Sequence, residues 1–437
     1  MKLTACQKSA LKALKSGSGN VFLTGVAGSG KSTVVARLLE KKDHPIVAST
    51  GTAALMLGGR TFHSFFGVGI MEGGFEETVK RALRNPHLAR RLKKADTVVI
   101  DEISMISGEF LRAAETITRL ARASGEPWGG MRIIAVGDFA QLPPVSRTPG
   151  RRDWAFLSET WKKSGFENLL LETVVRSSDQ RLLGVLNDVR VGELTYRVRD
   201  FLDSRIIDEE DDAINATILF PFRSNVEDYN LGRLRELDDK EHVFDTVYEI
   251  RAAKKDPKMR DKIMENLKRQ APVPGRIVLK RGALVMMRKN DLEGEYANGS
   301  LGHVRHIEDE ALEISLLAGG SVLVEKADFT YLDADGTPVA AARNFPVTLA
   351  YATTIHKSQG MTLDKAVIDL SGLWEPGQAY VGLSRVRSSD GLYITKWQPG
   401  SIRVDAAVAG FYEELAEKTT RTSPRTTCKD ADFLEEH

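Results

Sequence analysis

Short apolar runs alternate with helix-like segments along the first third of the chain. The runs occupy residues 21–23, 46–48, 97–100 and 132–136. Runs of this length, rich in β-branched residues, are typical of parallel strands buried on both faces. Between the last two runs lie apolar residues at helical spacing, Phe110, Ala114, Ile117 and Ala121, preceded by Ser107, a residue type that caps helices. Strand, helix and strand in this rhythm predict a doubly wound parallel α/β sheet.

Two further patterns of apolar and polar residues follow along the chain. Runs at 169–171, 217–220, 347–349 and 366–370 form a second alternating series, which predicts a second α/β domain. Between Arg276 and Leu332, short alternating stretches are separated by Gly-Gly, Asn-Gly and Asp-Gly pairs. Such pairs are typical of tight hairpin turns, so this segment predicts a small antiparallel barrel inserted in the second α/β domain.

These patterns predict the domain boundaries. The first α/β domain covers 1–165 and includes an insertion at about 67–95. The second covers 166–275 and 346–417, the inserted barrel covers 276–345, and 418–437 forms a mobile tail.

Composition limits the classes of function. The 437 residues are 42% hydrophobic and 28% charged, which excludes wholesale disorder and fibrous repeats. Lys plus Arg number 61 and Asp plus Glu 60, a formal net charge of +1. A protein that coats duplex DNA by charge alone is far more basic, so any polyanion site must be local.

The same composition bears on location. No apolar run approaches the roughly 18 residues of a membrane span, and the N-terminus lacks the apolar core of a secretory signal. The two cysteines, Cys6 and Cys428, have no histidine at metal-ligand spacing, so they make neither a zinc site nor a disulfide framework. We therefore expect no membrane contact and a reducing location, the cytosol or nucleoid of a bacterial type of cell.

The segment from Gly25 to Ser32, Gly-Val-Ala-Gly-Ser-Gly-Lys-Ser, matches G-x-x-x-x-G-K-[ST] between a predicted strand and a predicted helix. Glycines let backbone N–H groups curl around a phosphate, and the helix N-terminus adds positive potential. The lysine supplies charge to the β/γ oxygens, and the serine hydroxyl binds Mg²⁺. The predicted nucleotide-binding residues are Gly25, Gly28, Ser29, Gly30, Lys31, Ser32 and Thr33.

The predicted strand at 97–100 ends in Asp101-Glu102. An acidic residue at this edge can hold Mg²⁺ together with Ser32, and the next one can orient and deprotonate the attacking water. An acidic pair after a strand is by itself equally compatible with a solvated turn. Together with the glycine loop it predicts binding and hydrolysis of a nucleoside triphosphate.

A third predicted strand ends in Gly137-Asp-Phe-Ala-Gln-Leu-Pro-Pro-Val145. Gln141 stands where an amide can contact the γ-phosphate and sense its presence. The alternative is a proline-terminated loop beside the sheet.

This last run, together with Asp101-Glu-Ile-Ser-Met105, resembles superfamily 1 helicases, above all the PIF family (named for the yeast petite-integration-frequency helicase) and its RecD-like relatives. The resemblance extends in order from Gln7 to Arg385. Trp128 stands where the family commonly has Phe, and Gly382 where Ala is usual. The further matching segments are 49–69, 108–130, 171–176 (LETVVR), 354–360 (TIHKSQG) and 377–385 (GQAYVGLSR).

The resemblance implies roles for single residues. Gln7 reads the adenine edge, so the fuel is ATP, and Gly360 belongs to the nucleotide-binding positions. Arg176 and Arg385 reach from the second α/β domain across the cleft to the γ-phosphate. Arginines on a facing domain stabilise the charge of a phosphoryl-transfer transition state only when the cleft closes. Outside these motifs, each arginine would be read as a surface cation.

A near-neutral chain fits a single-strand motor, which holds the nucleic-acid backbone with hydroxyls, amides and a few cations and stacks bases on aromatic rings. Adjacent aromatics such as Phe65 and Phe66 more often lie in a core than stack on bases, so a core position is the alternative for these two. The loop at 221–225 reads Pro-Phe-Arg-Ser-Asn where the family has Pro-Thr-Asn, which weakens the case for contacts there. The candidate nucleic-acid residues are Thr52, His63, Ser64, Phe65, Phe66, Asn225, Asn298, Thr354, His356, Lys357 and Ser358.

The stretch 67–94 ends in basic residues, among them Arg90, Arg91, Lys93 and Lys94. By resemblance it holds the wedge that splits a duplex. The alternative is an ordinary crossover helix with a solvated basic face.

The resemblance thus implies two RecA-like parallel α/β motor domains with an inserted barrel similar to Src-homology-3 folds. The implied activity is an ATP- and Mg²⁺-dependent 5′-to-3′ DNA helicase, a monomeric motor on single strands and single-strand/duplex junctions, with ATP as its only small-molecule substrate. G-quadruplexes and RNA–DNA hybrids are implied substrates. The alternatives are a nucleic-acid-stimulated ATPase that remodels without unwinding, and a P-loop switch or kinase.

Overall fold

The first lobe is built on six strands in the order β3-β2-β4-β5-β1-β6, each parallel to its neighbours. The structure is a computed structural model that describes residues 3–40, 44–50, 53–54, 59–69, 71, 73–145, 152–207, 216–222, 224–251, 257–289, 291, 295–296, 298–332 and 338–422. The strands are β1 (Val21–Gly25), β2 (Ile46–Ala48), β3 (Arg60–Thr61), β4 (Thr97–Asp101), β5 (Arg132–Val136) and β6 (Glu167–Leu171).

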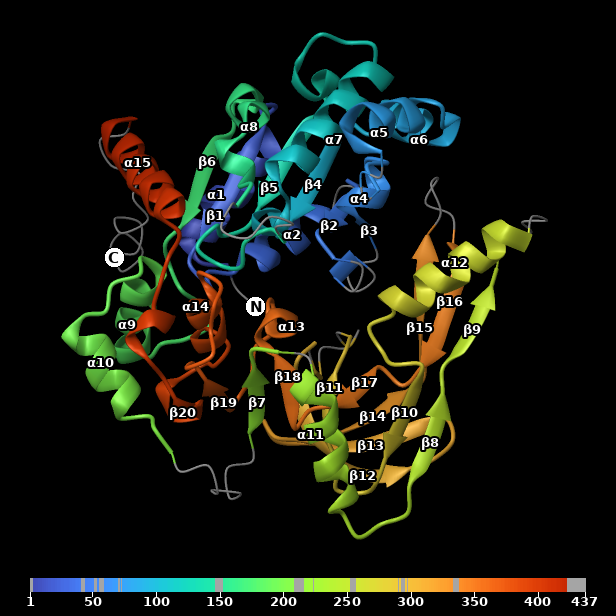
Figure 1. Ribbon diagram of the computed structural model, residues 1–437, viewed down its shortest axis with the longest axis vertical. Helices are drawn as coiled ribbons and strands as arrows, with labels where there is room; N and C mark the ends of the chain where they lie inside the picture. The colour runs from blue at the N-terminus through green and yellow to red at the C-terminus, as the bar shows by residue number, and fades with distance from the viewer. Residues whose placement is uncertain are drawn as a thin grey trace, which may run out of the picture.

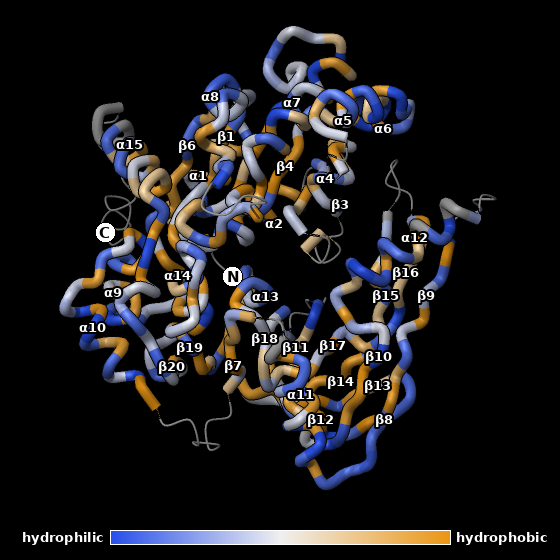
Figure 2. The backbone as a smooth tube through the Cα atoms, in the orientation of Figure 1, coloured by the Kyte–Doolittle hydropathy of each residue, from blue (hydrophilic) through white to orange (hydrophobic). Residues whose placement is uncertain are grey.

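Helices cover both faces of this sheet, as the alternating pattern predicts (Figure 1). On one face, α1 (Ala5–Ser16) and α2 (Lys31–Leu39) share a core with alternate residues of the central strands. On the other lie α7 (Gly108–Ala121) and α8 (Glu159–Ser164). The Ser107 Oγ accepts a hydrogen bond from the Phe110 N–H, which confirms the predicted cap. Figure 2 shows hydrophobic residues along these strands and hydrophilic ones on the outer helices.

A helical excursion connects β3 to β4. It contains α4 (Phe62–Phe65), α5 (Gly74–Leu83) and α6 (Pro86–Lys94). The helices α5 and α6 pack on one another and on α7, at one edge of the lobe (Figure 1). Basic residues lie in the last turn of α6: Arg91, Lys93 and Lys94.

Two segments assigned by pattern to the second domain pack on the first lobe instead. The run at 169–171 lies in β6, which pairs with β1 from Val21 opposite Glu167 to Gly25 opposite Leu171. The helix α15 (Ala406–Thr422) also packs here, since the Phe411 ring contacts the rings of Phe22, Phe139 and Phe156. It extends five residues into the predicted tail, whose remainder, 423–437, lies outside the described residues.

The second lobe has a four-stranded parallel sheet in the order β18-β7-β19-β20. This confirms a second α/β unit. The strands are β7 (Thr217–Phe220), β18 (Ala352–Thr354), β19 (Ala366–Asp369) and β20 (Leu392–Lys396). The helices are α9 (Gln180–Arg190), α10 (Tyr196–Asp203), α11 (Ser224–Arg235), α13 (Ile355–Ser358) and α14 (Gln378–Leu383).

The predicted antiparallel insert is present, with a hydrophobic core of its own. It begins earlier than the predicted residue 276, because β8 (His242–Asp245) pairs with β10 (Arg276–Leu279) and β9 (Val247–Ile250) pairs with β16 (Pro338–Asn344). The helix α12 (Pro257–Gln270) packs against β9 and β16. The remaining strands are β11 (Leu284–Met287), β12 (Leu301–Ile307), β13 (Ala311–Leu316), β14 (Ser321–Glu325), β15 (Ala327–Leu332) and β17 (Val347–Leu349).

The run at 347–349, assigned by pattern to the second lobe, is β17 and pairs antiparallel with β11 of the insert. Its apolar residues fit either sheet, so composition could not decide. The described strands of the insert form three separate sheets: β14-β13-β12-β11-β17, β15-β16-β9 and β10-β8. The likeness to Src-homology-3 barrels therefore stays a prediction.

Candidate nucleotide site and nucleic-acid face

The glycine loop connects β1 to α2 in the predicted place. Gly28 and Gly30 adopt φ angles of 80° and 82°, which only glycine tolerates readily. A Cβ on Gly28 would lie 2.7 Å from the Cβ of Arg176, and one on Gly30 would lie 2.2 Å from the Gln7 Nε2. These glycines are therefore required both by backbone conformation and by close neighbours.

The lysine of the loop is held over the loop itself. The Lys31 Nζ donates hydrogen bonds to the carbonyls of Gly25 (2.8 Å) and Val26 (3.3 Å). Burial lowers the pKa of Lys31, and the carboxylates of Asp138 and Glu102 oppose that shift. An ammonium whose hydrogen bonds go only to loop carbonyls can exchange them for the oxygens of an anionic ligand such as a triphosphate.

The three hydroxyl side chains of the glycine loop and the first turn of α2 differ in their exposure to solvent. The Ser29 Oγ is buried and, within the described part of the chain, has no hydrogen-bond partner. Ser32 is exposed and Thr33 half-buried in the first turn of α2. Oxygen ligands of this kind, with a carboxylate, are those that Mg²⁺ prefers.

Gln7 is buried against the loop. Its Nε2 donates to the Ser29 carbonyl at 3.0 Å, and its Oε1 accepts from the Thr4 N–H at 3.1 Å as part of a capping box. Each amide atom keeps capacity for one more hydrogen bond. The position beside Gly30 is shown, whereas reading of adenine by Gln7 stays a prediction.

The acidic pair lies where β4 ends. Burial, reinforced by the neighbouring Glu102, raises the pKa of Asp101 to about 7. Burial also raises the pKa of Glu102, although Lys31, Arg385 and Gln359 favour its ionised form. Glu102 has a φ of 51°, in the left-handed region that few non-glycine residues adopt, so the backbone is strained at this position.

Glu102 is also in contact with the second lobe. The Gln359 Nε2 donates to the Glu102 Oε2 at 3.1 Å, and the Gln359 Oε1 is buried without a partner among the described residues. Gln359 lies in the segment 354–360 that matches the family, but no role for it was predicted from the sequence. Its place between two predicted site residues, Ser358 and Gly360, was the available signal.

Arg176 does not come from the second lobe as predicted. It follows β6 of the first sheet, and its backbone N–H donates to the Gly28 carbonyl of the glycine loop at 3.1 Å. Its Nη1 then reaches the Ser384 carbonyl of the second lobe at 2.7 Å. The Arg176 guanidinium therefore reaches from the first lobe to the second, whereas the opposite direction was predicted. The reason is that 169–171 belongs to the first sheet.

Arg385 lies on the second lobe as predicted and is 2% exposed. Burial and the nearby charge of Arg176 lower the pKa of Arg385 to about 9, while Glu102 opposes this shift. Its guanidinium donates to second-lobe groups: the carbonyls of Val381, Ser358 and Met361 and the hydroxyl of Ser384. A direct contact with a γ-phosphate would need some of these bonds to be exchanged, so that role stays a prediction.

Gln141 is 5% exposed and sits against the start of α14. A Cβ on Gly377 would lie 2.4 Å from the Gln141 carbonyl oxygen, and Gly377 has a φ of 80°. The segment predicted to sense the γ-phosphate is therefore in backbone contact with the second lobe.

Asp138 is a buried junction that sequence reasoning did not assign. Its carboxylate is 0% exposed and pairs with Arg190 at 3.0 Å. It also accepts hydrogen bonds from Tyr380 (3.3 Å) and Tyr412 (2.9 Å). Burial opposes ionisation, yet the charges of Arg190 and Lys31 hold the pKa of Asp138 below its ordinary value. The available signal was a charged residue two positions after a buried strand.

Tyr380 extends this junction to the glycine loop. Its hydroxyl accepts a hydrogen bond from the Ala27 N–H at 2.7 Å while donating to Asp138. Asp138 thus ties together the end of β5, the helices α9 and α14 of the second lobe and, through Tyr412, the helix α15.

On the first lobe, two of the candidate nucleic-acid residues are corrected. Phe65 is 2% exposed and Phe66 0%, within the core between the helical excursion and the sheet, so neither ring presents a face to a base. Their apolar character decides this, as in most adjacent aromatic pairs. His63 packs edge-on against Phe110 with ring centroids 4.6 Å apart, and burial lowers its pKa. Ser64 is exposed, and Thr52 lies outside the described residues.

On the second lobe, the candidates gather around α13. The Thr354 Oγ1 caps the helix by accepting from the Lys357 N–H, and the buried Ser358 Oγ donates to the Ile355 carbonyl. His356, Lys357 and Gly360 are exposed. Asn298 lies in the turn before β12, which approaches the same segment, since a Cβ on Gly299 would lie 3.3 Å from the Met361 Cβ. Asn225 lies in α11, and its side chain is outside the described part.

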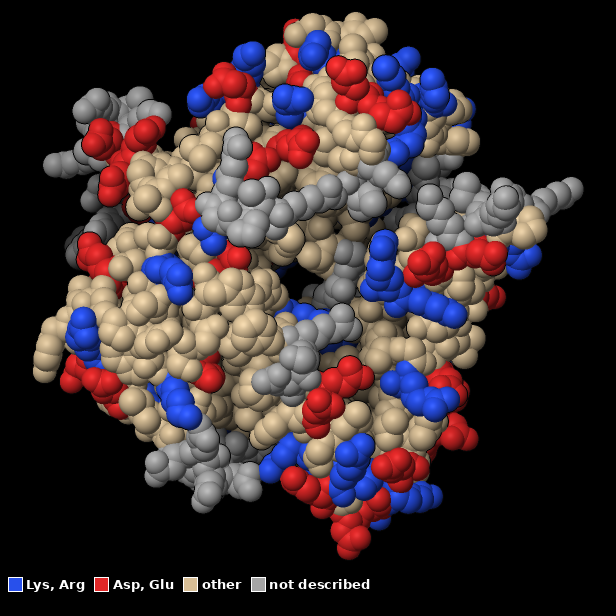
Figure 3. Space-filling view, viewed as in Figure 1, with Lys and Arg blue, Asp and Glu red and all other residues tan. Residues whose placement is uncertain are grey.

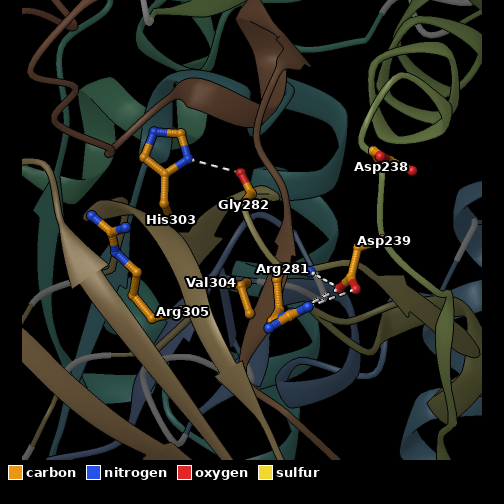
Figure 4. A pocket seen from close by; sticks show the side chains of 7 residues that line it. All are labelled: Asp238, Asp239, Arg281, Gly282, His303, Val304 and Arg305. Atoms are coloured by element: carbon orange, nitrogen blue, oxygen red, sulfur yellow. Dashed lines mark hydrogen bonds and ion pairs between the residues drawn. The ribbon is translucent and has the colours of Figure 1, made fainter.

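The remaining surface features do not add residues to these two sites. A cavity of about 490 Å³ on the insert, lined by Asp239, Arg281 and His303 among others, contains none of these residues (Figure 4). On the face in Figure 3, acidic and basic side chains intermingle, in keeping with the near-neutral charge. In the described ranges, no helix is both long and apolar enough to span a bilayer. In the same ranges, no group of three or more His, Cys, Asp or Glu side chains is placed to hold a metal.

Two α/β lobes that meet over a glycine loop and an acidic strand end define a P-loop nucleoside triphosphatase. The sequence profile of the PIF1-like helicases matches residues 2–194. The chain is 48% identical over 418 residues to the ATP-dependent DNA helicase Pif1 of Bdellovibrio bacteriovorus, covering 95% of this chain and 92% of that one. It therefore belongs to the PIF1-like helicase family.

Solved structures agree along nearly the whole chain. The crystal structure of Bacteroides sp. Pif1 in complex with ADP-AlF4 is similar with a TM-score of 0.81 at 28% identity, covering 96% of this chain and 98% of that one. The Bacteroides Pif1 structure bound to ssDNA is similar with a TM-score of 0.64 at the same identity and coverage.

Replacing Asp101 by Asn should stabilise the nucleotide-free protein more at pH 8 than at pH 5. Because the pKa of this carboxyl rises from 3.8 to about 7 on folding, the folded protein loses stability progressively as the pH rises from 3.8 to 7. Asn cannot ionise, so the variant does not lose this stability. We expect the gain in Tm at pH 8 to exceed that at pH 5 by roughly 2–4 °C. Thermal unfolding followed by circular dichroism measures it. The exposed Asp390→Asn is the control, and an equal gain at both pH values would contradict the assignment.

Replacing Asp138 by Asn should lower the free energy of unfolding by about 3 kcal/mol, because Arg190 would keep a buried charge without its counterion. ATP turnover should fall as well, since Tyr380 would lose the partner that holds it against Ala27. Chemical denaturation and a phosphate-release assay measure the two effects. The exposed pair Glu159–Lys162 supplies the control Glu159→Gln, expected within about 0.5 kcal/mol of the parent protein. Parent-like stability of Asp138→Asn would refute the junction.

Proposed function

We propose that the protein is an ATP-driven motor that moves along single-stranded DNA and unwinds duplex DNA ahead of it. One observation carries the proposal. The four-residue helix α13 presents His356 and Lys357 at the surface, and the residue that follows it, Gln359, hydrogen-bonds Glu102 in the nucleotide site. A displacement of His356 and Lys357 at the surface would therefore move Gln359 against Glu102, and a change at Glu102 would act on α13.

The residues of the first lobe account for fuel binding. The loop N–H groups and Lys31 bind the phosphates, and Ser32 with Asp101 would hold Mg²⁺, which supplies charge neutralisation on the phosphates when bound. Glu102 is placed to accept a proton from the attacking water, because its raised pKa makes it a better base than an exposed carboxylate. The relatives support ATP as the fuel, since they are named ATP-dependent helicases and one was solved with ADP-AlF4.

The arginines account for coupling to motion. Arg176 and Arg385 both lie where the lobes meet, so a γ-phosphate between them favours the closed arrangement and its release favours the open one. The chain is equally similar to the ADP-AlF4 and the unliganded forms of the Bacteroides relative, with a TM-score of 0.81 for each, and less similar to its ssDNA form, with 0.64. This supports a shift in the placement of the parts when a strand binds.

Several finer points stay predictions. They are the 5′-to-3′ polarity, the monomeric state, action on G-quadruplexes and RNA–DNA hybrids, the wedge role of the excursion at about 67–95, and a cytosolic or nucleoid location. The main alternative is an ATPase that moves on single strands without separating a duplex. Bound ssDNA in one Bacteroides structure fits both.

The test is ATP turnover with and without oligonucleotide, followed by unwinding of duplexes tailed at the 5′ or the 3′ end. We expect single strands to raise turnover at least about tenfold and the 5′-tailed duplex alone to be unwound in the presence of ATP. Lys31→Ala and Arg385→Ala should each lower turnover by about 10³-fold or more, with ATP binding largely kept in Arg385→Ala.

The matched control is Arg387→Ala, which removes a more exposed arginine two residues further on. Turnover that no oligonucleotide changes would overturn the motor. Stimulated turnover without strand separation would favour the alternative.

A further inference from the structure

Three aromatic rings come together at one edge of the second-lobe sheet. Phe222 follows β7, His356 lies in α13 directly after β18, and Trp374 follows β19. These strands are neighbours in the order β18-β7-β19 and run parallel, so the segments that follow them lie at the same edge. In parallel α/β sheets this edge is where ligands bind.

The rings are stacked and open to solvent. Phe222 and Trp374 lie nearly parallel, with centroids 4.6 Å apart and planes 9° apart. The His356 ring lies 6.3 Å from Trp374 at 28°. Phe222 is 51% exposed and Trp374 41%, whereas Trp128, Trp154 and Trp161 are at most 7% exposed.

Hydrogen bonds to a side chain hold the loop that carries Trp374 in place. The N–H groups of Trp374 and Glu375 both donate to the Gln378 Oε1, each at 3.0 Å, so the loop is fastened to the start of α14. Glu375, the nearest carboxylate along the chain, pairs with Arg152 at 2.9 Å. Its charge is therefore compensated, and a polyanion can approach. Exposed aromatic rings fixed in this way cost hydration free energy unless a flat apolar ligand covers them.

We propose that Phe222, Trp374 and His356 form a platform on which a base of single-stranded DNA stacks. The inference rests on the proposed function. Two observations select a nucleic-acid base as the occupant. The planes of Phe222 and Trp374 are nearly parallel, and His356 at the end of the group lies in α13, which carries exposed Lys357 and connects to Glu102 through Gln359. Stacking tolerates any base, because each one has a π-face, so the platform binds without sequence preference.

The experiment compares the binding of two fluorescent strands by anisotropy: an oligothymidylate, and an abasic deoxyribose-phosphate strand of equal length. We expect Phe222→Ala/Trp374→Ala to weaken binding of the oligothymidylate by about tenfold or more and of the abasic strand by less than about twofold. Trp374→Phe should restore most of the affinity, since it keeps a stacking face. The KM for ATP should not change, because the platform lies outside the glycine loop.

The control is Tyr196→Ala, which removes an 83% exposed aromatic ring of α10 and should leave both affinities unchanged. Equal weakening on the two strands, or none on either, would overturn the platform while leaving the motor intact. Failure of the parent protein to bind any strand would overturn the proposed function and the platform together. A rise in the KM for ATP without loss of strand binding would assign the rings to adenine and refute the proposal.

Discussion

The hydrogen bond from Gln359 to Glu102 joins the two lobes at the carboxylate that we propose accepts a proton from the attacking water. Glu102 is buried, so its ionised form depends on the few groups that reach it: Lys31 from its own lobe, and Gln359 and Arg385 from the other. In a low-dielectric site each of these partners matters more than it would in water. A shift of the second lobe therefore changes the proton affinity of Glu102 directly, and we propose that a strand bound at α13 acts on the same hydrogen bond.

Asp138 provides the second connection. Its carboxylate binds Arg190, Tyr380 and Tyr412, and Tyr380 in turn holds the Ala27 N–H of the glycine loop. A buried ion pair adds little net stability compared with a well-packed apolar contact, but it is costly to break halfway. The contacts of Asp138 therefore fasten side chains of the second lobe to the glycine loop of the first.

Local motifs were predictable from sequence, whereas the assignment of segments to lobes was not. Lys31 and Asp101 follow buried strands at fixed spacing, so their places at the nucleotide site follow from the pattern. The runs 169–171 and 347–349 have the same apolar character as their neighbours, and only hydrogen-bond pairing with β1 and β11 decides their sheet. Because the run 169–171 was assigned to the wrong sheet, Arg176 was wrongly predicted to come from the second lobe. The rings of Phe65 and Phe66 illustrate a further limit, since burial depends on distant partners that periodicity does not reveal.

We propose that the segment formed by α13 and Gln359 couples the nucleic-acid face to hydrolysis. The most direct measurement is the stimulation of ATP turnover by oligothymidylate in Gln359→Ala, compared with the parent protein, at strand concentrations that saturate both. We expect the variant to bind the strand with parent-like affinity while losing most of the stimulation, because Glu102 no longer has its hydrogen bond from the second lobe. A variant that is stimulated as strongly as the parent would contradict this coupling.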